Sequence, residues 1–264
     1  MATFQSGGLT LAYDDIGSGE AGTAVLVHGF ATSRAENWKR LGWYASFERK
    51  GYRAVALDLR GHGESDKPHE ASAYGRANML GDVLALMDHL SLERANLLGF
   101  SMGSHLSLRL ALQAPERVSN LILGGVGERM LPNAPPQPLP TMTMREAMTT
   151  DDPSKITDAT LKGFRQFADN EGADRLALAA CSEGAGEPLD PDDLLRLRMP
   201  VLVVAGALDK IAGDPQALAD AIPGAKAVTL PGCDHFSAIP HALFKASVFD
   251  FLEGWLDDDM PTFE

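Results

Sequence analysis

Six short apolar runs recur along the chain, most of them beside a glycine, and the segments between them space their apolar residues as helices do. Runs that are apolar on both sides of the strand pleat are typical of parallel strands covered by helices on both faces. The pattern therefore predicts an α/β fold with a mostly parallel sheet. The predicted strands cover residues 24–27, 53–57, 95–98, 118–123, 201–205 and 225–230.

The remaining pattern predicts a hairpin at the start of the chain and helices between the strands. Leu9, Leu11 and Tyr13 follow the pair Gly7-Gly8 at alternating positions, as in a short antiparallel hairpin. The Ala114-Pro115 step ends one helix, because the residue before proline is disfavoured in helical geometry. Helical spacing predicts helices over residues 36–50, 72–90, 101–113, 215–221 and 240–255.

The alternation of strand and helix is interrupted between Val126 and Arg198. A proline-rich stretch, residues 132–140, precedes predicted helices near 157–170 and 173–183. We interpret residues 126–198 as a helical cap inserted into a core domain of residues 1–125 and 199–264. Such a cap would enclose the cleft at the carboxyl end of the parallel strands. Its apolar residues either line that pocket or pack the cap against itself: Met130, Leu131, Met142, Met144, Met148, Phe164 and Phe167.

Composition and charge narrow the class of protein. The chain has 264 residues, 45% of them hydrophobic, which supports one domain with a substantial core. Its formal net charge is −13 and its basic residues are scattered, which argues against nucleic acid or an anionic membrane as partner. Cys181 and Cys233 form neither a C-x-x-C pair nor a disulfide framework. Because the chain shows no signal-peptide pattern and no apolar run of about 18 residues, we expect a soluble, cytoplasmic protein.

One motif points to chemistry. The sequence Gly99-Phe100-Ser101-Met102-Gly103 lies directly after a predicted strand and directly before a predicted helix. G-x-S-x-G in this context holds the serine hydroxyl at the tip of a strained turn, and the glycines avoid collisions with neighbouring segments. A serine hydroxyl is a weak nucleophile at its free pKa, so Ser101 needs a general base, an orienting carboxylate and oxyanion donors.

A histidine late in the chain is the predicted base, because this motif is followed in hydrolases by the acid and then the histidine. His235 lies in a loop just after the last predicted strand, from which its imidazole can reach back toward Ser101. His105, one helical turn after the serine, is expected to pack beneath the turn. The other histidines suit structural or surface positions: His28 and His62 in glycine turns, and His69, His89 and His241 at the surface.

Asp209 is the preferred acid. It follows the predicted strand 201–205 and lies between Ser101 and His235 in chain order. A carboxylate there would hold the imidazole in the useful tautomer and stabilise the imidazolium. Asp209 could instead serve a turn or a helix cap. Two rivals stay open: Glu128, which follows the predicted strand 118–123 and is the stronger of the two, and Asp214.

Two backbone N–H groups are predicted to bind the oxyanion, those of Met102 and Phe30, the latter in the sharp turn after the predicted strand 24–27. Phe236, next to His235, is a further candidate for the substrate pocket. Residues 58–65 concentrate arginine, aspartate and histidine, but their spacing matches neither a phosphate-binding loop nor a metal site. We interpret them as a structural turn that ties adjacent loops together, and we expect no metal and no cofactor.

Together, the His28-Gly29-Phe30 turn, residues 58–65, the serine motif, residues 206–209 and the His235 loop resemble the α/β-hydrolase superfamily, over nearly the whole chain and in the family's order. The resemblance implies an eight-stranded, mostly parallel sheet with helices on both faces, a cap after strand six, and a Ser101–Asp209–His235 triad. Small bacterial esterases, enol-lactone hydrolases and cofactor-free haloperoxidases are the most similar groups.

Some branches of the family fit less well. Haloalkane dehalogenases and epoxide hydrolases are set aside because they carry aspartate where this chain has Ser101. Carbon–carbon bond hydrolases are disfavoured because the chain offers no clear pair of arginines for a dienolate carboxylate. Fold resemblance alone does not choose a substrate.

The sequence therefore predicts a serine hydrolase that cleaves a carboxylic ester, thioester or lactone of a small-molecule acyl substrate through an acyl-enzyme. Two alternatives stay open. Peroxide or an alcohol could replace water on the same acyl-enzyme, which would make the protein a perhydrolase or acyltransferase. The scaffold could also serve as a ligand receptor without turnover. The sequence carries no signal for the oligomeric state.

Overall fold

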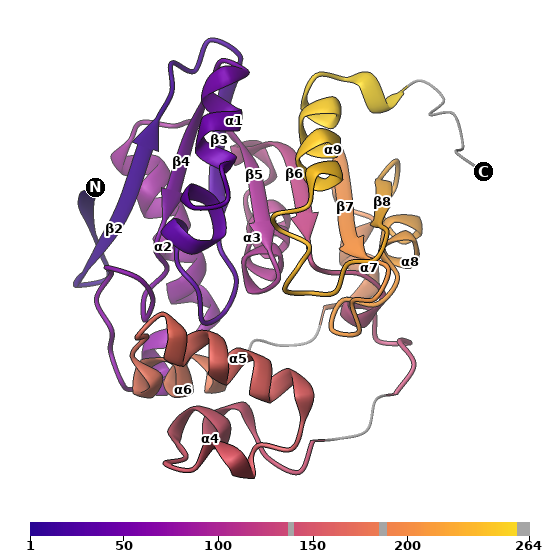
Figure 1. The fold of residues 1–264 in the computed structure, drawn as a ribbon. Helices are drawn as coiled ribbons and strands as arrows, with labels where there is room; N and C mark the ends of the chain where they lie inside the picture. Colours follow the sequence, from indigo (N-terminus) through magenta and orange to yellow (C-terminus); the bar gives the residue numbers. More distant parts are fainter. Residues whose placement is uncertain (137–139, 185–188, 258–264) are drawn as a thin grey trace.

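A computed structural model describes residues 1–136, 140–184 and 189–257. These residues contain one eight-stranded sheet in the order β1-β2-β4-β3-β5-β6-β7-β8 (Figure 1). β2 pairs antiparallel with β1 and β4, and every other pairing is parallel. The mostly parallel α/β sheet is thus confirmed. The strands are β1 Ala2–Ser6, β2 Leu9–Ile16, β3 Gly22–Val27, β4 Tyr52–Leu57, β5 Ala95–Phe100, β6 Val118–Gly124, β7 Val201–Gly206 and β8 Lys226–Leu230.

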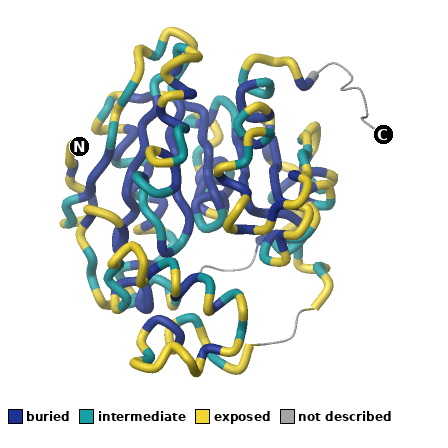
Figure 2. The backbone as a smooth tube through the Cα atoms, in the orientation of Figure 1, coloured by how far each residue is buried: buried dark blue, intermediate teal, exposed yellow. Residues whose placement is uncertain are grey.

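Helices cover both faces of the sheet, so each face has its own apolar core. α1 and α9 cover one face, where their side chains Trp43, Phe47 and Phe244 are fully buried. α2, α3 and α8 cover the other face, where Leu86, Leu108 and Leu218 are fully buried. Figure 2 shows the central strands buried along most of their length. The helices in question are α1 Trp43–Arg49, α2 Arg76–His89, α3 Met102–Gln113, α8 Pro215–Asp220 and α9 Ala242–Leu252.

Two predicted helices are each divided by a glycine. The helix expected over residues 36–50 is a π-helical turn, Ala35–Lys39, followed by α1, because Gly42 between them has a φ of +74°. The helix expected over 72–90 is a short 3₁₀ turn, Ala71–Tyr74, followed by α2, because Gly75 between them is extended with a ψ of 147°. Helical periodicity continues across both breaks, so the pattern alone missed them.

Three helices that come between β6 and β7 in the chain lie together below the edge of the sheet at which the parallel strands end (Figure 1). They are α4 Met144–Thr149, α5 Ala159–Asn170 and α6 Arg175–Glu183, and the short α7 Pro191–Leu194 follows. α5 turns Leu161, Phe164 and Ala168 inward. These helices lie where the sequence predicts a cap, and the boundaries of 126 and 198 remain a prediction. Within the described residues, no helix combines the length and apolar character that crossing a membrane requires.

Candidate active site

Ser101 occupies a sharp turn between β5 and α3. Its backbone has a φ of +51°, a conformation that costs a residue with a side chain about 1–3 kcal/mol. The Ser101 N–H donates to the Gly124 carbonyl of β6 at 2.8 Å, and the turn is closed by the Ser104 N–H, which donates to the Ser101 carbonyl at 2.9 Å. A Cβ at Gly99 would lie 2.4 Å from the Gly103 carbonyl oxygen, and one at Gly103 would lie 2.0 Å from that of Val27. The two glycines are therefore required by close backbone approach.

A chain of hydrogen bonds joins Ser101 to His235 and Asp209, which come from three loops at the carboxyl ends of strands. His235 Nε2 lies 2.9 Å from Ser101 Oγ, and His235 Nδ1 lies 2.8 Å from Asp209 Oδ2. Both His235 and Asp209 are 4% exposed. The other carboxylate oxygen, Asp209 Oδ1, accepts from the N–H groups of Ile211 and Ala212 at 3.0 and 2.9 Å. This arrangement holds the imidazole with Nε2 free to accept the serine proton.

A cavity of about 210 Å³ opens beside Ser101. Gly29, Phe30, Ser101 and His235 contribute to its wall. The Phe30 and Met102 backbone N–H groups have no hydrogen-bond partner among residues 1–136, 140–184 and 189–257. They are therefore available to an oxygen atom of a bound molecule.

Comparison with known proteins agrees with the fold. The sequence profile of the alpha/beta hydrolase fold family matches residues 24–171, more than half of the chain. The chain belongs to this family. The enol-lactonase from Burkholderia xenovorans has the same fold as this α/β hydrolase, with a TM-score of 0.71 and 26% identity, covering 96% of this chain and all of that one.

Two curated relatives from Pseudomonas putida extend the comparison. One is a 2-hydroxy-6-oxononadienedioate/2-hydroxy-6-oxononatrienedioate hydrolase, 29% identical over 93% of this chain and 92% of its own length. The other is the dihydrolipoyllysine-residue acetyltransferase component of an acetoin cleaving system, 36% identical over 87% of this chain. This α/β hydrolase spans 62% of that second protein. A carbon–carbon bond hydrolase, a branch disfavoured on sequence grounds, is thus among its relatives.

The two alternative acids, Glu128 and Asp214, contact residues other than His235. The nearest ion-pair partner of the Glu128 carboxylate is Arg129, at 3.7 Å. Asp214 caps α8, where its Oδ1 accepts from the Gln216 N–H at 2.9 Å. In the described part of the chain, neither carboxylate is hydrogen-bonded to His235. The geometry therefore favours Asp209 as the orienting acid.

The remaining histidines occupy structural or surface positions. His28 and His62 are buried in the two glycine turns, as expected, and burial lowers the pKa of His28 to about 4 and that of His62 to about 3. Both rings are therefore neutral, with Nδ1 donating to a backbone carbonyl at 2.7 and 2.9 Å respectively. His105 was expected beneath the serine turn but is exposed on α3.

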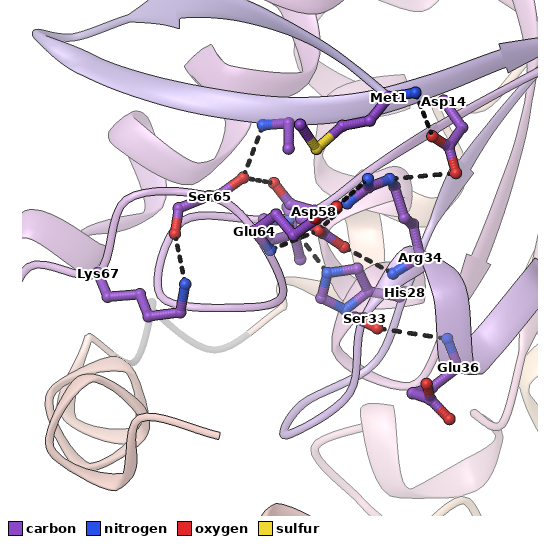
Figure 3. A network of polar contacts seen from close by, with 12 residues as sticks. Met1, Asp14, His28, Ser33, Arg34, Glu36, Asp58, Glu64, Ser65 and Lys67 are labelled. Carbon is purple, nitrogen blue, oxygen red and sulfur yellow. Dashed lines mark hydrogen bonds and ion pairs between the residues drawn. The ribbon is translucent and has the colours of Figure 1, made fainter. Parts of the chain in front are cut away.

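A buried polar network ties the loop after β3 to the loop after β4, as predicted for residues 58–65. Arg34 forms ion pairs with Asp58 and Glu64, and its Nε lies 3.3 Å from Asp14 (Figure 3). Asp58 also accepts from the Arg34 and Glu64 N–H groups at 2.7 and 2.8 Å. His28 Nε2 accepts from the Leu59 N–H at 3.0 Å. These contacts tie the loop that carries Gly29 and Phe30 to the loop after β4, and Gly29 lies beside Ser101.

The predicted pocket residues divide into two groups. Phe164, Phe167 and Phe236 line the cavity, and Phe164 contacts Phe236 edge-to-face with 5.3 Å between ring centroids. The other candidates pack among apolar side chains and are not in the described wall of this cavity, so their place in a substrate pocket stays a prediction. Met130 and Leu131 pack against the main core. Met142, Met144 and the fully buried Met148 pack among the inserted helices.

The sequence reasoning missed part of the cavity wall, namely Thr32, Glu36, Asn37 and Leu41 near the π-helical turn and Ile239 and Pro240 after His235. Proximity in sequence to the Phe30 turn and to His235 is a signal that could have found them. The described residues also contain no group of three or more His, Cys, Asp or Glu side chains arranged to hold a metal ion.

Proposed function

We propose that this α/β hydrolase cleaves a carboxylic ester, thioester or lactone through an acyl-enzyme on Ser101. The observation that carries the proposal is the hydrogen-bond chain from Ser101 Oγ through His235 to Asp209, with distances of 2.9 and 2.8 Å. A nucleophile, a base and an orienting acid in contact meet the requirements of serine acyl transfer. The enol-lactonase neighbour, whose substrate class is a cyclic ester, supports the same chemistry.

Each of the site residues has its own role in the reaction. Ser101 Oγ attacks the carbonyl carbon while His235 Nε2 takes the hydroxyl proton, and Asp209 stabilises the imidazolium that forms. The Phe30 and Met102 N–H groups donate to the oxyanion of the tetrahedral intermediate. His235 then passes the proton to the leaving alcohol, thiol or enol. Water, deprotonated by His235, attacks the acyl-enzyme and releases the acid with Ser101 restored.

The cavity wall favours an apolar acyl group. Five phenylalanines contribute to the wall, together with Leu41, Ile239 and Pro240. They are Phe30, Phe100, Phe164, Phe167 and Phe236. Because α5 supplies Phe164 and Phe167, we propose that residues 126–198 act as a cap that helps set specificity.

Hydrolysis of a p-nitrophenyl ester series from acetate to decanoate, compared with the Ser101→Ala variant, tests this function. We expect turnover and fluorophosphonate labelling in the wild type and loss of both in the variant, with an unchanged circular dichroism spectrum. The chain-length profile then measures the acyl cavity. Undiminished turnover in Ser101→Ala would refute the proposal. Tight binding of an ester that is never consumed would favour the receptor alternative.

Acyl transfer is the second candidate, and the similarity to an acetyltransferase component favours it. The same acyl-enzyme serves water, an alcohol, a thiol or peroxide, so Ser101, His235 and Asp209 keep their roles. Product analysis with a competing alcohol, thiol or peroxide separates the two reactions. Transfer product that exceeds the acid at millimolar acceptor would make this protein a transferase or perhydrolase.

A further inference from the structure

The wall of the cavity beside Ser101 is largely apolar, and apart from Ser101 and His235 most of its polar side chains come from one segment, where the π-helical turn Ala35–Lys39 supplies two adjacent polar residues. Glu36 and Asn37 line the cavity there together with Thr32. The Glu36 N–H donates to Ser33 Oγ at 3.3 Å (Figure 3). The turn is closed by the Asn37 N–H, which donates to the Ser33 carbonyl at 2.9 Å. Both residues therefore belong to the wall that a molecule bound in this cavity would contact.

Asn37 has a buried donor without a partner. Its side chain is 4% exposed, and Oδ1 accepts from the Gly29 N–H at 3.4 Å. Its Nδ2 has no hydrogen-bond partner among the described residues. A buried donor left unsatisfied costs about 1–3 kcal/mol, so a bound molecule that offers an oxygen to Nδ2 regains that free energy. A buried donor of this kind makes binding specific, because a molecule that lacks the acceptor leaves the donor unpaired.

Glu36 supplies a partly buried carboxylate beside this donor. Its side chain is 12% exposed, and Oε1 lies 2.5 Å from an Arg40 guanidinium nitrogen. The same nitrogen lies 3.5 Å from Glu171, so one exposed guanidinium serves two carboxylates. Burial and then the Glu171 charge raise the pKa of Glu36. The described cavity wall contains no lysine or arginine.

We propose that Glu36 and Asn37 form a polar subsite that takes an uncharged hydrogen-bonding group, a hydroxyl or an amide, on an otherwise apolar acyl chain and rejects a carboxylate. The hydroxyl or amide donates to the Glu36 carboxylate and accepts from Asn37 Nδ2. A substrate carboxylate would face the Glu36 carboxylate, and the neighbouring Arg40 guanidinium is already shared between Glu36 and Glu171. This inference rests on the proposed acyl cleavage and adds its substrate class. It separates this protein from its relative that acts on a dienedioate.

Three matched sets of p-nitrophenyl esters test the subsite, with butanoyl, hexanoyl and octanoyl chains that end in a methyl group, a hydroxyl or a carboxylate. In the wild type, for the chain length that reaches the subsite, we expect kcat/KM of the carboxylate ester to be at least about tenfold below that of the hydroxyl ester. In Glu36→Gln, the discrimination between the carboxylate and methyl esters should fall at least about tenfold. In Asn37→Leu, the preference for hydroxyl over methyl should disappear.

Comparing ratios of esters removes any general loss of activity, such as the one expected if Asn37 also positions the Gly29 loop. Glu183→Gln is the matched control, because Glu183 is a carboxylate of the inserted helices that pairs with Arg145 and is not in the described wall of this cavity. Its ratios should stay within about twofold of the wild type. Equal kcat/KM for carboxylate and hydroxyl esters at all three lengths would overturn the subsite. So would an effect of Glu183→Gln as large as that of Glu36→Gln.

Binding separates this inference from the proposed function. Calorimetric affinities of the intact esters for Ser101→Ala should rank hydroxyl above carboxylate whether or not the wild type turns them over. Failure of all esters to react in the wild type, with this ranking preserved, would refute the ester hydrolase and support the subsite. Turnover of the methyl esters with equal affinities for hydroxyl and carboxylate would support the hydrolase and refute the subsite.

Discussion

Replacing Asp209 by asparagine changes the hydrogen-bond chain without changing its shape. Asp209 Oδ1 accepts from the Ile211 and Ala212 N–H groups at 3.0 and 2.9 Å, while Oδ2 faces His235 Nδ1 at 2.8 Å. In the variant, the two backbone donors require the amide oxygen at the Oδ1 position, so the NH₂ group faces His235. Because an amide NH₂ only donates, Nδ1 must become the acceptor and the imidazole proton must move to Nε2.

A His235 with its proton on Nε2 cannot accept the proton of Ser101. The wrong tautomer in a serine triad lowers kcat about 10⁴-fold, or about 5.5 kcal/mol of transition-state stabilisation. We therefore expect kcat for a p-nitrophenyl ester to fall about 10³- to 10⁴-fold in Asp209→Asn. KM should change little, because Asp209 does not line the cavity.

The controls are the two rival carboxylates, through Glu128→Gln and Asp214→Asn. Steady-state kinetics at pH 7.5, with circular dichroism and melting temperature for each variant, give the comparison. Both controls should keep kcat within about threefold of the wild type. The reasoning is refuted if folded Asp209→Asn keeps more than about a tenth of the wild-type kcat, or if Glu128→Gln loses as much as Asp209→Asn.

Three further predictions concern stability and the cavity. Asp82 is fully buried and accepts two hydrogen bonds of 2.6 Å from Arg60. Asp82→Ala should therefore lower the free energy of unfolding by about 3–5 kcal/mol and the melting temperature in calorimetry by about 6–20 °C. A shift below about 2 °C would contradict this. Since burial lowers the pKa of His28 and His62 to about 4 and about 3 from 6.5, the unfolded chain binds protons that the folded chain does not. The free energy of unfolding should therefore be fully retained above pH 6.5 and fall as the pH drops toward 4; equal urea midpoints at pH 7 and 4.5 would be inconsistent with neutral buried rings. Phe167→Ala should shift the ester chain-length optimum to longer acyl groups, whereas Met142→Ala should leave it unchanged; identical profiles would show that α5 does not shape the cavity.

Local chemistry explains why the serine turn and its partners could be located in advance. Glycines at 99 and 103 are required by contacts with the backbone of Gly103 and Val27, and strand, turn and helix follow one another within a few residues. His235 and Asp209 follow strands β8 and β7, and carboxyl ends of parallel strands meet at one edge of a sheet. Strand order in the sequence was therefore enough to bring these side chains to one edge.

The folded structure was needed to decide between candidate residues on elements that are far apart in the sequence. Glu128 and Asp209 both follow strands, and only the packed loops show which carboxylate reaches His235. Met142 and Met144 satisfied the same apolar pattern as Phe164, yet they pack within the inserted helices. Periodicity tells which side of a helix is buried, but it does not tell which surface that side meets.

The sequence by itself determined the α/β class, the serine turn and the order of the residues that surround it, because backbone sterics and apolar periodicity act over a few residues. Only the tertiary structure decided which acid contacts His235, that Gly42 divides a predicted helix, and that Glu36 and Asn37 face the cavity. These outcomes depend on packing between segments far apart in the chain, and the free energy of that packing is not contained in any local pattern.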